Sequence, residues 1–301
     1  MTEARHEWVG FSLGRVWTIA LNTLTEAVRQ KVFLTLILFA LVLIASASFF
    51  SQFGFGEDGS QEALEQLKFI KDFCLGAISV FGVLIAIVGT AQLIPNELEQ
   101  RTIYTILSKP VRRVEFLLGK YAGSALLVLV SLVMMSLMFA AALKFKGDNY
   151  IGIARQTQQE SVNTPGADDA TRQVARIESA MYDSDLVKAL WLIYVKLALL
   201  AGITLLVSTF STSMVFNVAV ALLVFFAGHL VGAAKERWGE GGASRFLLAI
   251  IPDLGMFNVA DDVILGNAIP WGYVARVTLY GVAYLVAVLA AAHFLFADRE
   301  I

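Results

Sequence analysis

Residues able to do metal, nucleophilic or acid–base chemistry are few in this sequence. The three histidines, His6, His229 and His293, form no H-E-x-x-H motif and no His/Asp/Glu cluster with metal-ligand spacing. The single cysteine, Cys74, excludes an intramolecular disulfide and a cysteine-cluster metal site. We interpret Cys74, His229 and His293 as packing residues, because all three fall in apolar runs. We therefore expect this chain to bind no metal and no cofactor.

The sequence also lacks the elements of a nucleotide-hydrolysing or proteolytic site. There is no phosphate-binding loop of the form G-x-x-x-x-G-K-[ST], so we do not expect the chain to hydrolyse ATP by itself. Glu97, Glu99 and Arg101 have a superficial similarity to the E-E-x-x-x-R motif of intramembrane prenyl-protein proteases. The glutamates are not adjacent, however, and no histidine motif accompanies them. We interpret Glu97 and Arg101 as an ion pair on a helix surface, worth roughly 0.2–0.5 kcal/mol.

The elements that must position these residues are apolar helices. Of the 301 residues, 57% are hydrophobic and only 16% are charged, whereas soluble domains carry roughly 25% charged residues. A net charge of −2 argues against nucleic acid as a partner. We predict an all-α polytopic membrane protein with one transmembrane domain over residues 1–301. Runs of about 20 apolar residues predict six transmembrane helices at 32–50, 73–94, 121–143, 189–209, 214–234 and 274–296.

Two segments flanking these spans are amphipathic or polar. Residues 11–28 have apolar side chains at helical spacing, including Trp17, and lie just before the first span. We predict a helix in the membrane interface, the alternative being a packing helix in the cytoplasm. Residues 144–188 have the composition of a soluble outer region, with a helix near 170–181 between flexible flanks. This region is either a docking site for a periplasmic partner or a spacer.

The connection from Pro95 to Lys120 is the most charged short link between two spans. It holds five cations and three anions in 26 residues, as expected of a cytoplasmic loop. Leu98, Thr102, Ile103, Ile106 and Leu107 recur at three- and four-residue spacing, which gives a short helix one apolar face. Pro110 ends this helix, because proline disfavours helical geometry in the residue before it. The pattern predicts a helix–break–helix elbow that contacts a partner.

The motif E-x-E-x-R-T-I-x-x-I-L-S-K-P-V-x-R-x-E-F-L-L-G-K in this link resembles the cytoplasmic loop of type-2 ABC exporter permeases, and most nearly that of the NosY-like group. The resemblance implies that this loop is the coupling helix, seated in a groove of an ABC ATPase subunit. It implies that residues 11–28 form an interfacial elbow helix. The ATPase-coupling residues would then be Glu97, Glu99, Arg101, Thr102, Ile103, Tyr104, Ile106, Leu107, Lys109 and Arg113.

Residues 244–266 form the second informative segment. Its apolar runs are too short to cross a membrane and are broken by proline and glycine, which indicates re-entrant or interfacial elements. The family has re-entrant outer helices here, and P-x-L-x-x-F-N resembles its motif. The resemblance implies an outer re-entrant gate formed by Pro252, Leu254, Phe257 and Asn258.

Loop charges set the expected orientation. With the N-terminus inside, the cytoplasmic segments hold ten Lys and Arg residues in 66 positions, and the outer ones eleven in 106. This bias, strongest in the 95–120 link, predicts cytoplasmic N- and C-termini in the inner (plasma) membrane. Lys196 lies about 10 Å into the fourth span. We interpret it as an anchor that reaches the outer interface, the alternative being a residue of a transport pathway.

We therefore predict the permease subunit of an ABC exporter. Its partners would be two copies of an ABC ATPase, a second permease copy, membrane lipid and, by one reading, a periplasmic accessory protein. ATP and Mg would bind to the ATPase, where hydrolysis drives export or work on a periplasmic partner. The alternative is an ion-coupled secondary transporter, which usually needs ionisable groups near the bilayer midplane. A membrane enzyme or a structural anchor fits less well, because no catalytic constellation is present.

Overall fold

The fold consists of helices packed along one long bundle. A computed structural model describes residues 11–51, 61–99, 112–160, 167–181, 183–238 and 250–297, and contains no strand in these ranges. Six of the helices are long and apolar enough to cross a membrane, which confirms the predicted all-α polytopic class. The elements are α1 (Leu13–Val28), α2 (Lys31–Phe50), α3 (Gln61–Ala91), α4 (Leu93–Glu99), α6 (Arg113–Glu160), α7 (Ala167–Met181), α8 (Asp185–Phe210), α9 (Met214–Trp238), η1 (Gly255–Phe257), α11 (Ala260–Leu265) and α12 (Trp271–Ala297).

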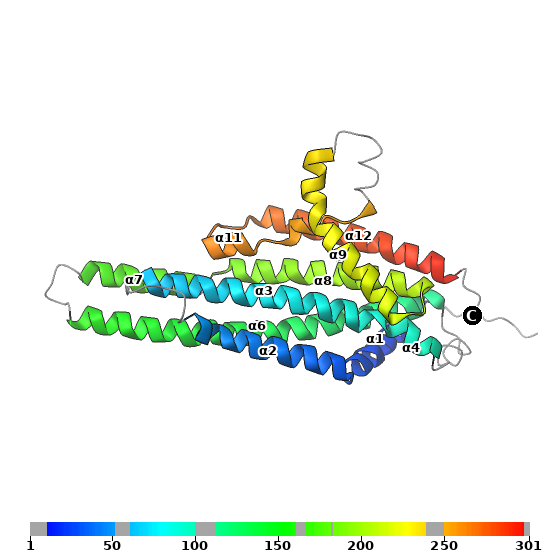
Figure 1. Ribbon diagram of the computed structural model, residues 1–301, viewed down its shortest axis with the longest axis horizontal. Helices are drawn as coiled ribbons and strands as arrows, with labels where there is room; N and C mark the ends of the chain where they lie inside the picture. The colour runs from blue at the N-terminus through cyan, green and yellow to red at the C-terminus, as the bar shows by residue number, and fades with distance from the viewer. Residues whose placement is uncertain are drawn as a thin grey trace, which may run out of the picture.

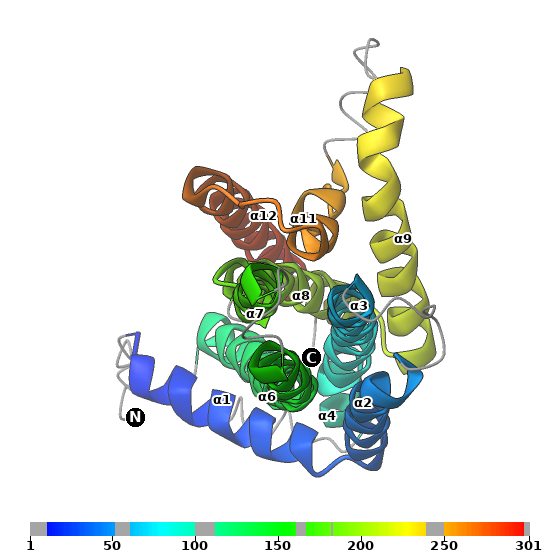
Figure 2. The same ribbon diagram turned by 90° about the vertical axis from the view of Figure 1, so that its left-hand side faces the viewer.

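The long helices run side by side, and two elements depart from their direction. Figure 1 shows α2, α3, α6, α8 and α12 lying lengthwise, with α7 at one end and α1 and α4 at the other. We call these the α7 end and the α1 end. Figure 2 shows α1 lying crosswise over the bundle and α9 leaning away from it. Leu13, Trp17 and Leu21 form an exposed apolar stripe on α1, at 43–74% exposure.

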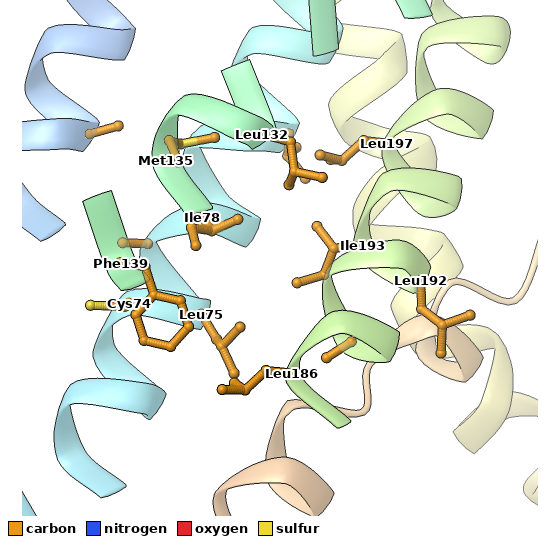
Figure 3. Packing of buried hydrophobic residues seen from close by; sticks show 14 of the residues in the cluster. Cys74, Leu75, Ile78, Leu132, Met135, Phe139, Leu186, Leu192, Ile193 and Leu197 are labelled. Atoms are coloured by element: carbon orange, nitrogen blue, oxygen red, sulfur yellow. The ribbon is translucent and has the colours of Figure 1, made fainter. Parts of the chain in front are cut away.

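The core is organised around α8, whose side chains are buried along most of its length because α3, α6, α9 and α12 surround it. Figure 3 shows Ile193 and Leu197 of α8 turned toward α3 and α6. Helices approach closely where a glycine faces a large side chain. A Cβ on Gly82 of α3 would lie 2.6 Å from Leu197, and one on Gly281 of α12 would lie 2.7 Å from Val195. Close packing of this kind holds helices together in lipid, where the hydrophobic effect does not act between them.

The position of Lys196 on this central helix corrects one prediction. Its side chain is only 2% exposed and donates a hydrogen bond to the Ser79 hydroxyl of α3, with an N···O distance of 2.9 Å. The expected anchor at the outer interface is therefore wrong. Lys196 lies on the face of α8 that packs against α3, so its side chain does not reach the bundle surface.

The polar segment 144–188 also contains more helix than predicted. We expected flexible flanks around one helix, but α6 continues without interruption to Glu160, and α7 packs against it. Leu143, Gly147 and Ile151 recur every four residues and are buried, which gives this part of α6 a face for packing. Met181 of α7 lies against it, within 2.0 Å of a Cβ placed on Gly147. The start of α3 joins the pair through a hydrogen bond from the Tyr150 hydroxyl to the side chain of Gln66.

Candidate functional site: the α1 end of the bundle

The predicted coupling segment leaves and re-enters the bundle at the α1 end. The described chain stops at Glu99, the last residue of α4, and resumes at Arg112, just before α6. Of the predicted coupling residues, only Glu97 and Arg113 have described side chains. Arg101, Thr102, Ile103, Tyr104, Ile106, Leu107 and Lys109 lie outside the described residues, as does the side chain of Glu99.

Two glycines let α1 cross closely over the start of α6. A Cβ on Gly119 would lie 2.6 Å from the side chain of Ile19. One on Gly123 would lie 2.6 Å from Thr23 and 2.8 Å from the backbone oxygen of Ala20. Glycines four residues apart share one face of a helix and allow a second backbone to approach. The sequence places Gly123 in a run of small residues, Ala122 to Ala125, which predicts a packing face; its G-x-x-x-G spacing with Gly119 was not singled out.

Glu115 fixes the first turn of α6 to the beginning of α1. Its carboxylate is fully buried and accepts two hydrogen bonds from the Arg15 guanidinium, with N···O distances of 2.7 and 3.0 Å. It also accepts from the backbone N–H groups of Ser12 and Arg112, at 2.7 and 3.1 Å. The bond to Arg112 caps the helix, since Glu115 is its third residue. Lying before the apolar run, Glu115 has its pKa lowered to about 2, chiefly by the bonds from Arg15.

A second buried cluster joins α6 to the helix that precedes the coupling segment. The ammonium of Lys120 is 1% exposed and lies 2.5 Å from a carboxylate oxygen of Glu97, which is 6% exposed. A carboxylate oxygen of Glu26, near the end of α1, lies 3.8 Å from the same ammonium. Lys120 therefore connects α1, α4 and α6 in a site with little access to water. Burial raises the pKa of Glu97, and the nearby ammonium opposes that rise.

The same end is tied to the remaining spans. The Arg113 guanidinium donates to the backbone carbonyl of Phe296 on α12 at 3.2 Å, and the rings of Phe116 and Phe296 stack with centroids 5.9 Å apart. The Asn217 amide of α9 donates to the carbonyl of Ala91, at the end of α3, at 3.0 Å. The two predicted coupling residues that can be placed, Glu97 and Arg113, thus contact other helices of this chain.

The predicted outer gate packs between α9 and α12. Leu254 is fully buried, and its N–H donates to the Gly228 carbonyl of α9 at 3.0 Å. A Cβ on Gly228 would lie 2.7 Å from Leu254, so this glycine makes room for the segment. Phe257 is also fully buried, and its ring centroid lies 6.3 Å from that of Tyr280 on α12. Pro252 is buried, whereas Asn258 is exposed. Residues 244–249 of the predicted segment lie outside the described residues.

Asp253, within this segment, was not singled out from the sequence. Its carboxylate lies 3.0 Å from the ammonium of Lys235 on α9, and its backbone N–H donates to the Tyr280 hydroxyl at 2.8 Å. These contacts bind the segment to both neighbouring helices. The pairing joins residues 18 positions apart in the sequence, so no local spacing reveals it.

A further ionic cluster fixes the loop before α12 to the start of α8. Asp185 and Lys188 form a pair with an N···O distance of 2.5 Å, and both are buried. The same two side chains bond the backbone N–H and carbonyl of Ile269, at 3.1 and 2.8 Å. The Lys188 ammonium also lies 5.0 Å from the ring centroid of Trp271. This cluster holds the entry of α12 in place.

The described residues offer no metal centre: no three His, Cys, Asp or Glu side chains lie close enough together to hold an ion. Cys74 is fully buried beside the carbonyl of Ile44, and His229 packs edge-on against Phe225 with a ring nitrogen 3.0 Å from its carbonyl. These positions agree with packing roles. The described residues at the α1 end provide ion pairs and close helix packing.

The bundle of six membrane-length helices, with a crosswise helix and ion pairs at the flanks of a charged loop, defines a polytopic membrane protein. The chain belongs to the ABC-2 family transporter proteins, whose sequence model matches residues 17–301. Chains of this family are the membrane subunits of ABC transporters, are not themselves catalytic, and have an ABC ATPase as partner. No curated protein matches the sequence.

Proposed function

We propose that this chain is the permease subunit of an ABC exporter in the inner (plasma) membrane, with the α1 end and both termini in the cytoplasm. Family membership and the basic 95–120 link support this orientation. Two copies of the chain and two ATPase subunits would form the transporter, with ATP and Mg on the ATPases. The motif in the link further supports a place in the NosY-like group.

The observation that carries the proposal is that buried ion pairs lie on both sides of the coupling segment. Before it, Glu97 of α4 pairs with Lys120; after it, Glu115 of α6 pairs with Arg15 of α1. Breaking a buried pair costs about 3–5 kcal/mol. A force applied to the segment therefore moves α1, α4 and the foot of α6 together, because separating them is costly.

The coupling segment would supply the contact with the ATPase. We propose that its apolar residues fill a groove on the ATPase and that its cations pair with acidic residues on the rim. The apolar set is Ile103, Tyr104, Ile106 and Leu107, with Thr102 and Glu99 beside it; the cations are Arg101, Lys109 and Arg113. Part of the Arg113 guanidinium is already engaged by Phe296, so Arg101 and Lys109 would be the principal rim contacts.

Co-purification tests this function. The tagged chain is extracted from native membranes in mild detergent, and its partners are identified by mass spectrometry and assayed for vanadate-sensitive ATP hydrolysis. We expect a stoichiometric ATPase with the wild type, and none with an I103D/L107D variant. The control is T212D, which adds a charge to an exposed turn between α8 and α9. ATPase retained by I103D/L107D would contradict the proposed contact, and no ATPase with the wild type would contradict the function.

One observation favours the alternative, an ion-coupled secondary transporter. Lys196 is a buried amine inside the bundle, bonded to Ser79 and to no carboxylate of the described chain. An ion-coupled mechanism requires Lys196 for transport, and a protonophore would abolish that transport in proteoliposomes. The ABC mechanism predicts transport that depends on ATP, resists a protonophore and survives in a K196M variant.

A further inference from the structure

A groove of about 400 Å³ lies between α6 and α8, toward the α7 end of the bundle. Its two rims are rows of exposed apolar side chains at four-residue spacing, so each row follows one face of its helix. The rims are formed by Leu129, Val133 and Leu137 of α6 and by Val187 and Trp191 of α8. None of the sites described above uses these side chains.

The floor of the groove is less exposed than its rims. Leu132 is 5% exposed, and Ser136 and Tyr194 are half-buried. The Tyr194 ring packs beside that of Trp191, with the centroids 5.9 Å apart. The Trp191 indole N–H donates to the Thr278 hydroxyl of α12 at 3.1 Å. Because this bond holds the largest side chain of the rim in place, the groove is formed before a ligand enters it.

The predicted spans place the groove in the hydrocarbon of the membrane. Its α6 lining, within residues 129–140, lies inside the third predicted span, and its α8 lining lies inside the fourth except for Val187. Most of both ranges falls in the half of the span nearer the α7 end, hence in one leaflet. The lining extends about 10–16 Å along the two helices, and the hydrocarbon of one leaflet is about 15 Å thick. The groove therefore matches the length of a lipid chain that lies along the bundle.

The lining favours a flexible apolar chain over another helix. None of the described residues that line the groove is charged, and most of them are aliphatic. Helices in lipid pair through small residues, which let two backbones approach, whereas the rims here consist of Leu, Val and Trp side chains. These rims keep a second helix away from the floor, but a single hydrocarbon chain fits between them. An empty groove would forfeit the dispersion contacts of its lining.

We propose that this groove binds one acyl chain of a membrane lipid in the leaflet at the α7 end. The chain lies between the two rims, over Leu132 and Ser136 and against the Tyr194 ring. It contacts α6 and α8 together, and so fills the space that these two helices leave open. The groove selects no headgroup charge, because its described lining carries none. The site depends on the membrane position of α6 and α8 and not on an ATPase partner.

Native mass spectrometry of the purified chain in a neutral detergent tests the site. The added lipid is dimyristoyl phosphatidylcholine, which has no net charge, so that surface charges contribute little. The A140F and S136F variants each place an aromatic ring in the groove, since both residues line it. The control is A283F, which adds the same ring to an exposed alanine of α12 within the sixth predicted span but outside the groove. We expect about tenfold weaker lipid binding for A140F and S136F, and wild-type binding for A283F.

Equal lipid binding by the wild type, A140F and S136F would overturn the proposal. So would an equal loss in A283F, because binding would then reflect the apolar surface as a whole. Glycerophosphocholine, the headgroup without its chains, should not displace the lipid; displacement at equal concentration would overturn the assignment to an acyl chain. The same spectra report the oligomer. A dimer that becomes a monomer in A140F and S136F, with lipid binding unchanged, would show instead that a second copy covers the groove. Thermal unfolding equal to that of the wild type will show that the variants are folded.

Discussion

Replacing Lys120 by methionine tests whether the buried cluster at the α1 end joins α1, α4 and α6. Methionine keeps most of the length of the side chain but removes its charge, so Glu97, at 6% exposure, loses its contact with the Lys120 ammonium. Removing one member of a buried pair costs about 3–5 kcal/mol, because the remaining charge is uncompensated. We expect the free energy of unfolding of K120M at pH 8 to be lower than that of the wild type by this amount.

The loss should become smaller at lower pH. Burial raises the pKa of Glu97, and removing Lys120 removes the group that opposes the rise. The folded variant therefore takes up a proton more readily than the unfolded chain, whose glutamates titrate near 4.5. Stabilisation by this proton is present at low pH and is lost as pH rises through the raised pKa. K120M should accordingly be less destabilised at pH 5.5 than at pH 8.

The assay is equilibrium unfolding in a denaturing detergent, followed by helical circular dichroism at both pH values. The double variant K120M/E97Q removes both charges and should recover most of the loss, since no buried charge remains. K31M is the control, because Lys31 is an exposed lysine at the same end of the bundle. The reasoning is refuted if K120M matches K31M in stability, or if the double variant is as unstable as K120M.

Three further substitutions probe other contacts. G123A should lower the free energy of unfolding by up to about 2 kcal/mol, because overpacking against Ala20 and Thr23 costs about 1–3 kcal/mol and the better helix propensity of alanine returns only about 1 kcal/mol. In the control G76A the added Cβ meets nothing within 4 Å, so this variant should be neutral or more stable. Equal effects of the two substitutions in the same unfolding assay would contradict this expectation. E115Q should destabilise equally at pH 7.5 and 5.5, because a carboxyl with its pKa lowered from 4.5 to about 2 stabilises the fold above 4.5 and loses this only as pH falls through about 2; a loss that shrinks by pH 5.5 would argue against the Arg15 contact. L254A should cost about 2–5 kcal/mol and speed hydrogen exchange in residues 252–258, since it empties a fully buried position against Gly228; exchange equal to the wild type would show that Leu254 does not hold the segment.

The spans could be predicted from the sequence because membrane-length apolar runs are a local property. Hydropathy predicted six spans, and the structure has six helices of sufficient length and apolarity. The helices are longer than the spans, however. α6 runs from Arg113 to Glu160, although its apolar run ends near Leu143, because its outer part has a packing face that α7 covers. Composition alone gave that part the appearance of a flexible polar segment.

The contacts that organise the α1 end could not be predicted, because their partners are far apart in sequence. Arg15 and Glu115 are 100 residues apart, and nothing in the 95–120 motif indicates that Lys120 is a buried pairing residue. Lys196 was misassigned for a similar reason: its distance from the end of the span was known, but not that its face of α8 packs against α3. The contact residues from Arg101 to Lys109 remain predictions from the motif.

The length of α6 has a mechanical consequence. Its 48 residues form one helix about 72 Å long, and no proline interrupts it. Its foot is fixed to α1, and its far part carries α7. If this helix tilts as a rigid body, a tilt of about 5° at the foot displaces the far end by about 6 Å. A movement of the ATPase at one membrane surface would thus be transmitted through α6 and would move α6 and α7 at the opposite surface. This would not require an open transport pathway between the spans. A protein resting on that hairpin could be worked upon without any solute crossing the membrane.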